Sequence, residues 1–182
     1  MPKVIDSFSK EYAFLSNFER AGLLYDGDIY QSSEAAYQAA KLPQRRERIA
    51  FVGFNCLPWK AKRMGRNLPS FSIRKDWHEV KDQVMLDVIR AKFANGVLRE
   101  KLLNTGDAFL VEGNIHHDNY WGVCKCLTTP FEERKYGTKE GCNGTGLNRL
   151  GQLLMQVRDE LRLQGRARQL EGAGSLAVLA VS

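Results

Sequence analysis

Four polar side chains near the N-terminus share the spacing of one helical face. Glu34, Tyr37, Gln38 and Lys41 stand at i, i+3, i+4 and i+7, which places them along a single stripe of a helix. A helix that carries a carboxylate, an amide and an amine on one stripe, with small residues packed behind it, suits the wall of a pocket. A solvated amphipathic helix, with Glu34 favouring the N-terminal dipole, accounts equally well for the local pattern.

The residues before this stripe predict how its helix is placed. An Asp-Gly turn separates the short apolar segments Leu23–Tyr25 and Ile29–Tyr30, which predicts a β-hairpin. Ser32 or Ser33 then caps a helix that continues to about Lys41. The alanines between the polar positions allow close packing behind the stripe. The hairpin and the cap therefore hold the helix by its N-terminus.

The rest of the chain predicts an α+β fold in which helices dominate. Further helices are expected over 45–53, 59–66, 77–95, 98–104 and 147–164, and a strand over 109–112. Asp76 and Glu79 have the form of a capping box for the 77–95 helix, and Gly96 fits its end. Residues 113–146 are expected to be mostly loop, and a loop of this length is usually functional or disordered. Because strands do not alternate regularly with helices, a doubly wound sheet is not favoured.

Length and composition indicate one globular domain. The chain has 182 residues, 43% of them hydrophobic and 26% charged. We expect this domain to cover residues 1–164, followed by a poorly ordered Gly/Ala-rich tail at 165–182. No segment has the roughly 20 apolar residues of a membrane span, and the first residues lack the apolar region of a signal peptide. A cytoplasmic protein without a membrane partner is expected.

The four cysteines raise the question of a metal. Cys124, Cys126 and Cys142, together with His116 or His117, contain enough ligands for zinc. A C-x-C pair, however, lacks the two to four intervening residues usual in structural zinc sites. We therefore expect reduced thiols in a loop, with no metal and no cofactor.

Short motifs follow one another in a specific order over roughly residues 8–161. They are Phe14-Leu15-Ser16-Asn17-Phe18, Ser33-Glu34-x-x-Tyr37-Gln38-Ala39-x-Lys41, Ala61-x-x-Met64-Gly65-Arg66, Asp76-Trp77, Lys92-Phe93, Leu102-Leu103-x-Thr105-Gly106-Asp107, Leu110-Val111-Glu112, Asp118-x-x-Trp121-Gly122 and Gly146-x-Asn148-x-Leu150-Gly151-x-Leu153-Leu154-Met155. Each motif is weak alone, but the ordered set resembles the NADAR family, also called YbiA-like. The resemblance implies a single, mostly helical α+β domain that hydrolyses N-ribosides. Family activities include hydrolysis of phosphorylated ribosylamino-pyrimidine intermediates of riboflavin biosynthesis and removal of ADP-ribose from guanine bases in nucleic acid.

The chain departs from the family pattern at three places. The usual histidine after the helix-start glutamate is Ala35 here, and the usual phenylalanine two places later is Tyr37. The connection between Gly122 and Gly146 is also longer than in compact bacterial members, and it contains three of the cysteines. These departures bear on which substrate is taken.

The resemblance and the residue types together assign roles to the side chains. Cleavage of an N-glycosidic bond needs a carboxylate near the anomeric carbon and a proton source for the departing base. Glu34 is the predicted carboxylate. Lys41 either attacks the anomeric carbon as an amine, binds phosphate or is simply solvated. Asp118 holds a ribose hydroxyl, assists the proton transfer or caps its loop.

The predicted substrate-binding residues surround these three. Trp77 and Trp121 are candidates to stack on the base, and Arg66 to clamp phosphate. The full set is Asn17, Phe18, Tyr30, Ser33, Gln38, Arg66, Trp77, Trp121, Gly122 and Asn148. The three histidines are assigned no role.

Three functions remain open from the sequence. The first is an N-glycoside hydrolase acting on a phosphorylated riboside or an ADP-ribosyl group, free or carried on DNA or RNA. The second is a non-catalytic module that binds ADP-ribose or a related nucleotide. The third is a basic nucleic-acid-binding protein, which the net charge of +6 permits. The sequence predicts no oligomeric state.

Overall fold

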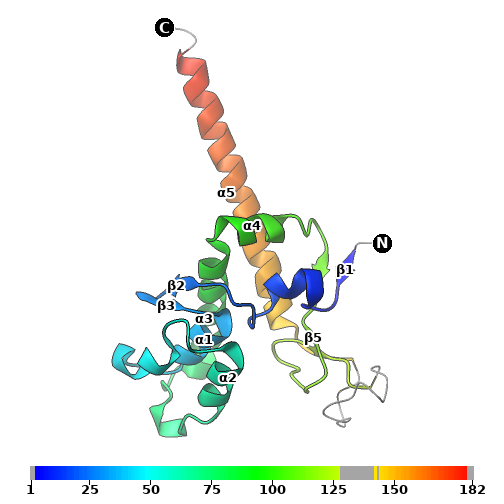
Figure 1. The fold of residues 1–182 in the computed structure, drawn as a ribbon. Helices are drawn as coiled ribbons and strands as arrows, with labels where there is room; N and C mark the ends of the chain where they lie inside the picture. The colour runs from blue at the N-terminus through cyan, green and yellow to red at the C-terminus, as the bar shows by residue number, and fades with distance from the viewer. Residues whose placement is uncertain (1–2, 128–141, 143, 180–182) are drawn as a thin grey trace.

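The computed structural model describes residues 3–127, 142 and 144–179, and the burial of side chains up to residue 169. Within these residues the fold consists of helices and three separate pairs of short strands, of which β2–β3 and β1 lie on opposite sides in Figure 1. In chain order the elements are β1 (Val4–Ile5), η1 (Lys10–Leu15), β2 (Leu23–Tyr25), β3 (Asp28–Tyr30), α1 (Ser33–Ala39), η2 (Arg45–Phe51), α2 (Pro58–Arg66), η3 (Ser70–Ser72), α3 (Trp77–Phe93), α4 (Gly96–Leu103), β4 (Phe109–Leu110), β5 (Gly113–Asn114), β6 (Val123–Cys124) and α5 (Arg149–Leu179). The predicted α+β class is confirmed.

Helix α1 is buried over its whole length at the centre of the fold. Ser32 is its N-cap, and the serine side chain accepts a hydrogen bond from the Ala35 backbone N–H. The alanines of the helix are at most 2% exposed and allow α2 and α3 to pack closely against it. A fully buried helix must satisfy its polar side chains internally or direct them into a cavity.

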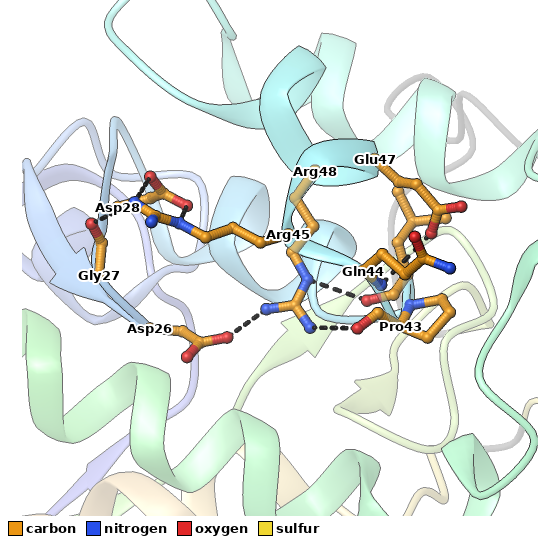
Figure 2. Close-up of polar contacts among 9 residues, drawn as sticks. Asp26, Gly27, Asp28, Pro43, Gln44, Arg45, Glu47 and Arg48 are labelled. Carbon is orange, nitrogen blue, oxygen red and sulfur yellow. Dashed lines mark hydrogen bonds and ion pairs between the residues drawn. The ribbon is translucent and has the colours of Figure 1, made fainter.

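The predicted hairpin is confirmed as the antiparallel pair β2–β3. Asp26 and Gly27 both have positive φ, 49° and 79°, as a tight turn of the primed type requires. Figure 2 shows how η2 clamps this turn: Arg45 donates to both carboxylate oxygens of Asp28, and Arg48 pairs with Asp26. Arg48 also donates to the carbonyls of the two residues after Lys41, Leu42 and Pro43. The clamp thereby fixes the chain at the end of the polar stripe.

Helix α3 begins at Trp77 as predicted, but the expected capping box is wrong. The Asp76 side chain makes no capping hydrogen bond, because its carboxylate pairs with Arg74 at 2.6 Å. Gly96 does not end α3 either. Asn95 accepts hydrogen bonds from the next turn, so Gly96 begins helix α4.

A parallel strand pair, β5–β6, lies in the region 113–146 that was expected to be mostly loop, and a second parallel pair precedes it at the predicted strand. β4 pairs with β1, and β5 pairs with β6 in the register Gly113↔Val123 and Asn114↔Cys124. Between them, Asn148 accepts from the Glu112 N–H and donates to the Leu110 carbonyl at 2.8 Å. The start of α5 is therefore fastened to the residues that join β4 to β5.

Helix α5 is longer than predicted, since it continues to Leu179 instead of ending near Gln164. Alanine, leucine, arginine and glutamine favour helices, and no proline interrupts this stretch. In Figure 1 the C-terminal part of α5 extends beyond the other elements. The predicted tail at 165–182 is thus helical over the part that the structure describes. No helix within the described residues is both long enough and apolar enough to cross a membrane.

Candidate active site

A cavity of about 410 Å³ lies beside α1, between α2, α3 and the segment that follows β4. Its walls carry acidic, basic and aromatic side chains together. They are Ser16, Asn17, Phe18, Glu34, Tyr37, Gln38, Lys41, Lys62, Arg66, Trp77, Met85, Glu112, Asn114, His116, Asp118, Trp121 and Leu150. All four residues of the predicted stripe are among them, so the pocket-wall interpretation of α1 is confirmed.

Glu34 is a buried carboxyl group at the N-terminal turn of α1. Its Oε1 accepts a hydrogen bond of 2.8 Å from Gln38 Nε2, and its own backbone N–H donates to the Asn17 carbonyl. Burial raises the pKa of Glu34, while the Gln38 hydrogen bond and the nearby Lys62 and Lys41 charges oppose this shift. Glu34 is thus positioned tightly and its protonation responds to charge in the cavity.

Lys41 reaches the same cavity from the other end of the stripe. Its ammonium donates to the Gly65 carbonyl at 3.1 Å, and the Arg74 backbone N–H holds the Lys41 carbonyl at 2.8 Å. Burial lowers the pKa of Lys41, and the Arg66 charge adds to the decrease. A lysine in this state supplies a neutral amine more readily than an exposed one.

Gly65 allows α2 to approach the stripe. A Cβ atom at this position would lie 1.9 Å from Gln38 Oε1 and 2.5 Å from Gln38 Cδ. The glycine of the Ala61-x-x-Met64-Gly65-Arg66 motif therefore has a steric reason to be glycine. It leaves room for the amide that orients Glu34.

Glu112 contributes a second carboxyl group to the cavity; the residue is half-buried, its Oε2 is fully buried, and no role was predicted for it from the sequence. Burial, reinforced by the Asp118 charge, raises its pKa to about 7. Among the described residues, its Oε2 has no hydrogen-bond partner. Asn148 holds its backbone N–H, as described above. The signal in the sequence was a carboxylate directly after a short apolar strand, within the Leu110-Val111-Glu112 motif.

Asp118 organises the loop that closes one side of the cavity. Its Oδ1 accepts hydrogen bonds from the backbone N–H groups of Tyr120 and Trp121, at 3.1 and 2.9 Å. The Asn114 side chain in turn bonds both the N–H and the carbonyl of Asp118. The loop-capping role that the sequence left open is therefore present, and the residue also lines the cavity.

Three aromatic rings form one wall. The Tyr37 ring centroid lies 5.1 Å from that of Trp77 and 5.4 Å from that of Trp121. Both tryptophans were predicted to face the substrate, and both line the cavity. Such a wall presents flat apolar surface to a planar ligand.

Basic side chains of α2 line the opposite side and continue beyond it. Lys62 and Arg66 border the cavity together with His116, and the same three residues border an adjoining hollow of about 460 Å³ that adds Arg63. Burial lowers the pKa of His116, and the Lys62 charge contributes. The sequence analysis missed Lys62 and His116 because neither stands in a pattern with a partner.

Four predicted binding residues do not line the cavity. Tyr30 is fully buried in the hydrophobic core, and Ser33 is buried in the first turn of α1. Gly122 packs against backbone, since a Cβ there would lie 2.2 Å from the Glu112 carbonyl oxygen. Asn148 makes the two backbone hydrogen bonds given above. All four support the walls and do not face the cavity.

The other nine predicted residues do line it. They are Asn17, Phe18, Glu34, Gln38, Lys41, Arg66, Trp77, Asp118 and Trp121. The two side-chain departures from the family pattern differ in position. Ala35 is fully buried in the core, whereas Tyr37 faces the cavity.

The chain is similar to proteins of known name over most of its length. The NADAR domain family matches residues 5–162. N-glycosidase YbiA of Shigella flexneri serotype 5b (strain 8401) is 39% identical over 161 residues, which cover 87% of each chain. A riboflavin biosynthesis protein of Vibrio vulnificus (strain YJ016) is 32% identical over 154 residues, 84% of this chain and 36% of that protein.

The fold is also similar to a solved structure. The NMR structure of the Escherichia coli protein YbiA superimposes with a TM-score of 0.70 at 35% identity, covering 91% of this chain and 89% of that one. Most residues that line the cavity belong to the motifs on which the sequence resemblance was based; Lys62, Met85, Asn114 and His116 do not. The match over residues 5–162 and the shared fold show that the chain belongs to the NADAR domain family.

Proposed function

We propose that this protein hydrolyses the N-glycosidic bond of a phosphorylated riboside. The observation that carries the proposal is the placement of two carboxyl groups, that of the buried Glu34 and that of the half-buried Glu112 with its fully buried Oε2, in one cavity with aromatic and basic walls. Relatives named N-glycosidase, similar over 87% of their length, support the reaction class. A binding module would have no need for two such carboxyl groups, whose desolvation costs free energy.

Glu34 is assigned the role of the carboxylate that faces the anomeric carbon. As the bond to the base breaks, positive charge develops on that carbon, and a carboxylate stabilises it or activates the attacking water. Burial raises the pKa of Glu34, and the Gln38 hydrogen bond and the Lys62 and Lys41 charges oppose this increase by stabilising the ionised form. A ligand cation in the cavity strengthens the same preference.

Glu112 is assigned the role of the proton donor. Its pKa of about 7 leaves a large fraction of the carboxyl group protonated near neutral pH. Its unpartnered Oε2 offers this proton to the nitrogen of the departing base. Two carboxyl groups in different environments thereby perform different roles.

The walls define the substrate class. The rings of Tyr37, Trp77 and Trp121 suit a planar base, because base stacking on aromatic rings does not depend on hydrogen-bond pattern. Lys62 and Arg66 suit phosphate, and the adjoining hollow extends this basic surface. An ADP-ribosyl group on guanine in nucleic acid and a phosphorylated ribosylamino-pyrimidine both combine these features.

Lys41 provides a second route for the same bond cleavage. Its neutral amine attacks the anomeric carbon as the bond to the base breaks and the base nitrogen takes a proton. The ring oxygen then leaves that carbon, takes the amine proton and becomes a hydroxyl group, which gives a Schiff base that water hydrolyses. The lowered pKa of Lys41 supports this route.

A hydrolysis assay on both substrates tests the proposal. The purified protein is incubated with DNA carrying ADP-ribosylated guanosine and, separately, with a phosphorylated ribosylamino-pyrimidine, and release of the base is measured. We expect turnover of at least one substrate, and its loss by 10²-fold or more in Glu34→Gln. The matched control is Glu100→Gln, at an exposed position of α4 outside the cavity.

Each outcome separates the candidates. Binding of both substrates without turnover would replace the hydrolase by a nucleotide-binding module. Equal, strongly salt-dependent binding of unmodified DNA by wild-type protein and Glu34→Gln, without turnover, would indicate a nucleic-acid-binding protein. Trapping of a substrate adduct by borohydride, abolished in Lys41→Ala, would establish the Schiff-base route over direct attack by water.

A further inference from the structure

Three cysteines and a histidine gather at one point outside the cavity. The ligand atoms of His117, Cys124, Cys126 and Cys142 all lie within 4.8 Å of one another. The three cysteines are at most 2% exposed and form a buried cluster separate from the main hydrophobic core. Free thiols in a loop were predicted from the spacing of the cysteines, and thiols gathered this closely with a histidine require a different explanation.

The C-x-C pair contributes two thiols from the end of β6 and from the turn that follows it. Cys124 ends β6, and Cys126 stands two residues later in that turn. Both thiols are fully buried and belong to the same cluster. A spacing of two to four residues is usual for ligands on one tight turn, and it does not exclude two ligands that the fold brings together in another way.

The other two ligands come from neighbouring segments. The parallel pairing of β5 with β6 brings the turn after β5 next to Cys124, and His117 stands in that turn with a φ of 65°. On the other side, the Cys124 N–H donates to the Thr145 carbonyl, and Cys126 Sγ donates to the Cys142 carbonyl at 3.7 Å, which places Cys142 beside the C-x-C pair. Three separate segments thus meet at the cluster.

The distances fit a tetrahedral ion. Zinc bonds of about 2.3 Å to sulfur and 2.0–2.1 Å to nitrogen give tetrahedral edges of about 3.6–3.8 Å. Cys124 Sγ and His117 Nδ1 are 3.7 Å apart, and no pair of ligand atoms in the cluster exceeds 4.8 Å. Asn119 Nδ2 lies 3.5 Å from Cys142 Sγ, as a donor that supports a thiolate ligand would.

We propose that His117, Cys124, Cys126 and Cys142 bind one structural zinc ion. Three thiolates and an imidazole fill all four positions of a tetrahedral zinc, which leaves none open for substrate. The ion would join the β5–β6 turn to the chain that enters α5. His117 lies between His116 and Asp118, which both line the cavity, so the ion would also fix that wall.

Metal analysis of the intact protein tests this proposal. The full chain is expressed in zinc-supplemented medium and freed of any affinity tag, and its metal content is measured by mass spectrometry. We expect one zinc per chain, and thiols of the cluster that react with a disulfide reagent only after chelation or unfolding. Replacement by Co²⁺ should give the thiolate-to-cobalt charge-transfer and tetrahedral d–d absorption bands.

Substitutions locate the ion. Cys126→Ser and His117→Ala should lower the zinc content and weaken the cobalt spectrum, whereas the matched control Cys56→Ser should keep both, because Cys56 is a buried cysteine outside the cluster. If a variant fails to fold, the metal content and thiol reactivity of the wild-type protein still test whether zinc is bound. Wild-type protein without stoichiometric zinc would overturn the proposal, whether its thiols react freely or its mass shows the loss of two hydrogens to a disulfide. These measurements do not depend on turnover, so they stand apart from the proposed hydrolase activity.

Discussion

Replacing Glu112 with glutamine should change stability and catalysis in opposite directions. The substitution keeps the size of the side chain but removes its titration. In the wild-type protein burial raises the pKa of Glu112 from 4.5 to about 7. Between these two pH values the unfolded chain releases the proton while the folded chain keeps it. The folded state is therefore progressively destabilised as the pH rises from about 4.5 to about 7.

The size of this effect follows from the pKa shift. A shift of about 2.5 pH units corresponds to about 3 kcal/mol of stability lost above pH 7. Glutamine does not titrate. The difference in free energy of unfolding between Glu112→Gln and the wild type should therefore shift in favour of the variant by up to about 3 kcal/mol between pH 5 and pH 8. Any free-energy cost of placing the amide in this site is independent of pH. It therefore does not alter how the stability difference between variant and wild type varies with pH.

Urea denaturation at several pH values from 5 to 8 measures the slope, with Glu100→Gln as the control whose difference from wild type should stay constant. On the same proteins, kcat/KM of the wild type should decrease as the pH rises through about 7, where Glu112 loses its proton. Glu112→Gln should lose 10²- to 10⁴-fold in turnover. A pH-independent stability difference between Glu112→Gln and wild type would refute the assignment of a titrating, buried proton donor.

Two packing predictions follow from the walls of the cavity. Gly65→Ala would place a methyl group 1.9 Å from Gln38 Oε1, so we expect about 1–3 kcal/mol of destabilisation and a loss of turnover, measured by thermal unfolding and the hydrolysis assay. Gly96→Ala, where no atom lies within 4 Å of the added Cβ, is the matched control, and an equal loss of turnover there would contradict this explanation. Asn148→Ala removes the hydrogen bond to the Glu112 N–H and leaves a backbone φ of 50° that alanine disfavours. Its free energy of unfolding should decrease by about 2–3 kcal/mol, and an unchanged value would show that Asn148 does not hold the β4–β5 segment.

Local sequence patterns correctly predicted the elements whose conformation is determined by neighbouring residues. The Asp26-Gly27 turn, the Ser32 cap and the helical stripe of Glu34, Tyr37 and Gln38 are found as predicted, because positive φ, capping and helical period depend on neighbouring residues; the helix ends at Ala39, two residues before the predicted Lys41. Asp76 shows the limit of such patterns. A carboxylate at a helix start caps the helix only if no stronger partner is within reach, and here Arg74 is.

The tertiary structure decided which residues meet across the chain. Glu112 became a candidate proton donor because the fold buries it beside Asp118 in the cavity that Glu34 lines, 78 positions earlier in the numbering. In the same way Gly122 and Asn148, which looked like binding residues, support the walls from behind. Contacts between residues far apart in the chain produce no periodic pattern in the sequence from which they could be predicted.

The polar stripe of α1 illustrates what the sequence determines and what the tertiary structure determines. The sequence by itself determined that Glu34, Tyr37 and Gln38 share one helical face, since the period of a helix is fixed by backbone geometry; Lys41 follows just after the helix, which ends at Ala39 in the structure. Whether that face met water or a cavity depended on how α2, α3 and the segment after β4 pack around it. The same holds for the cysteines: their spacing disfavoured a metal, and only the pairing of β5 with β6 brought four ligands together.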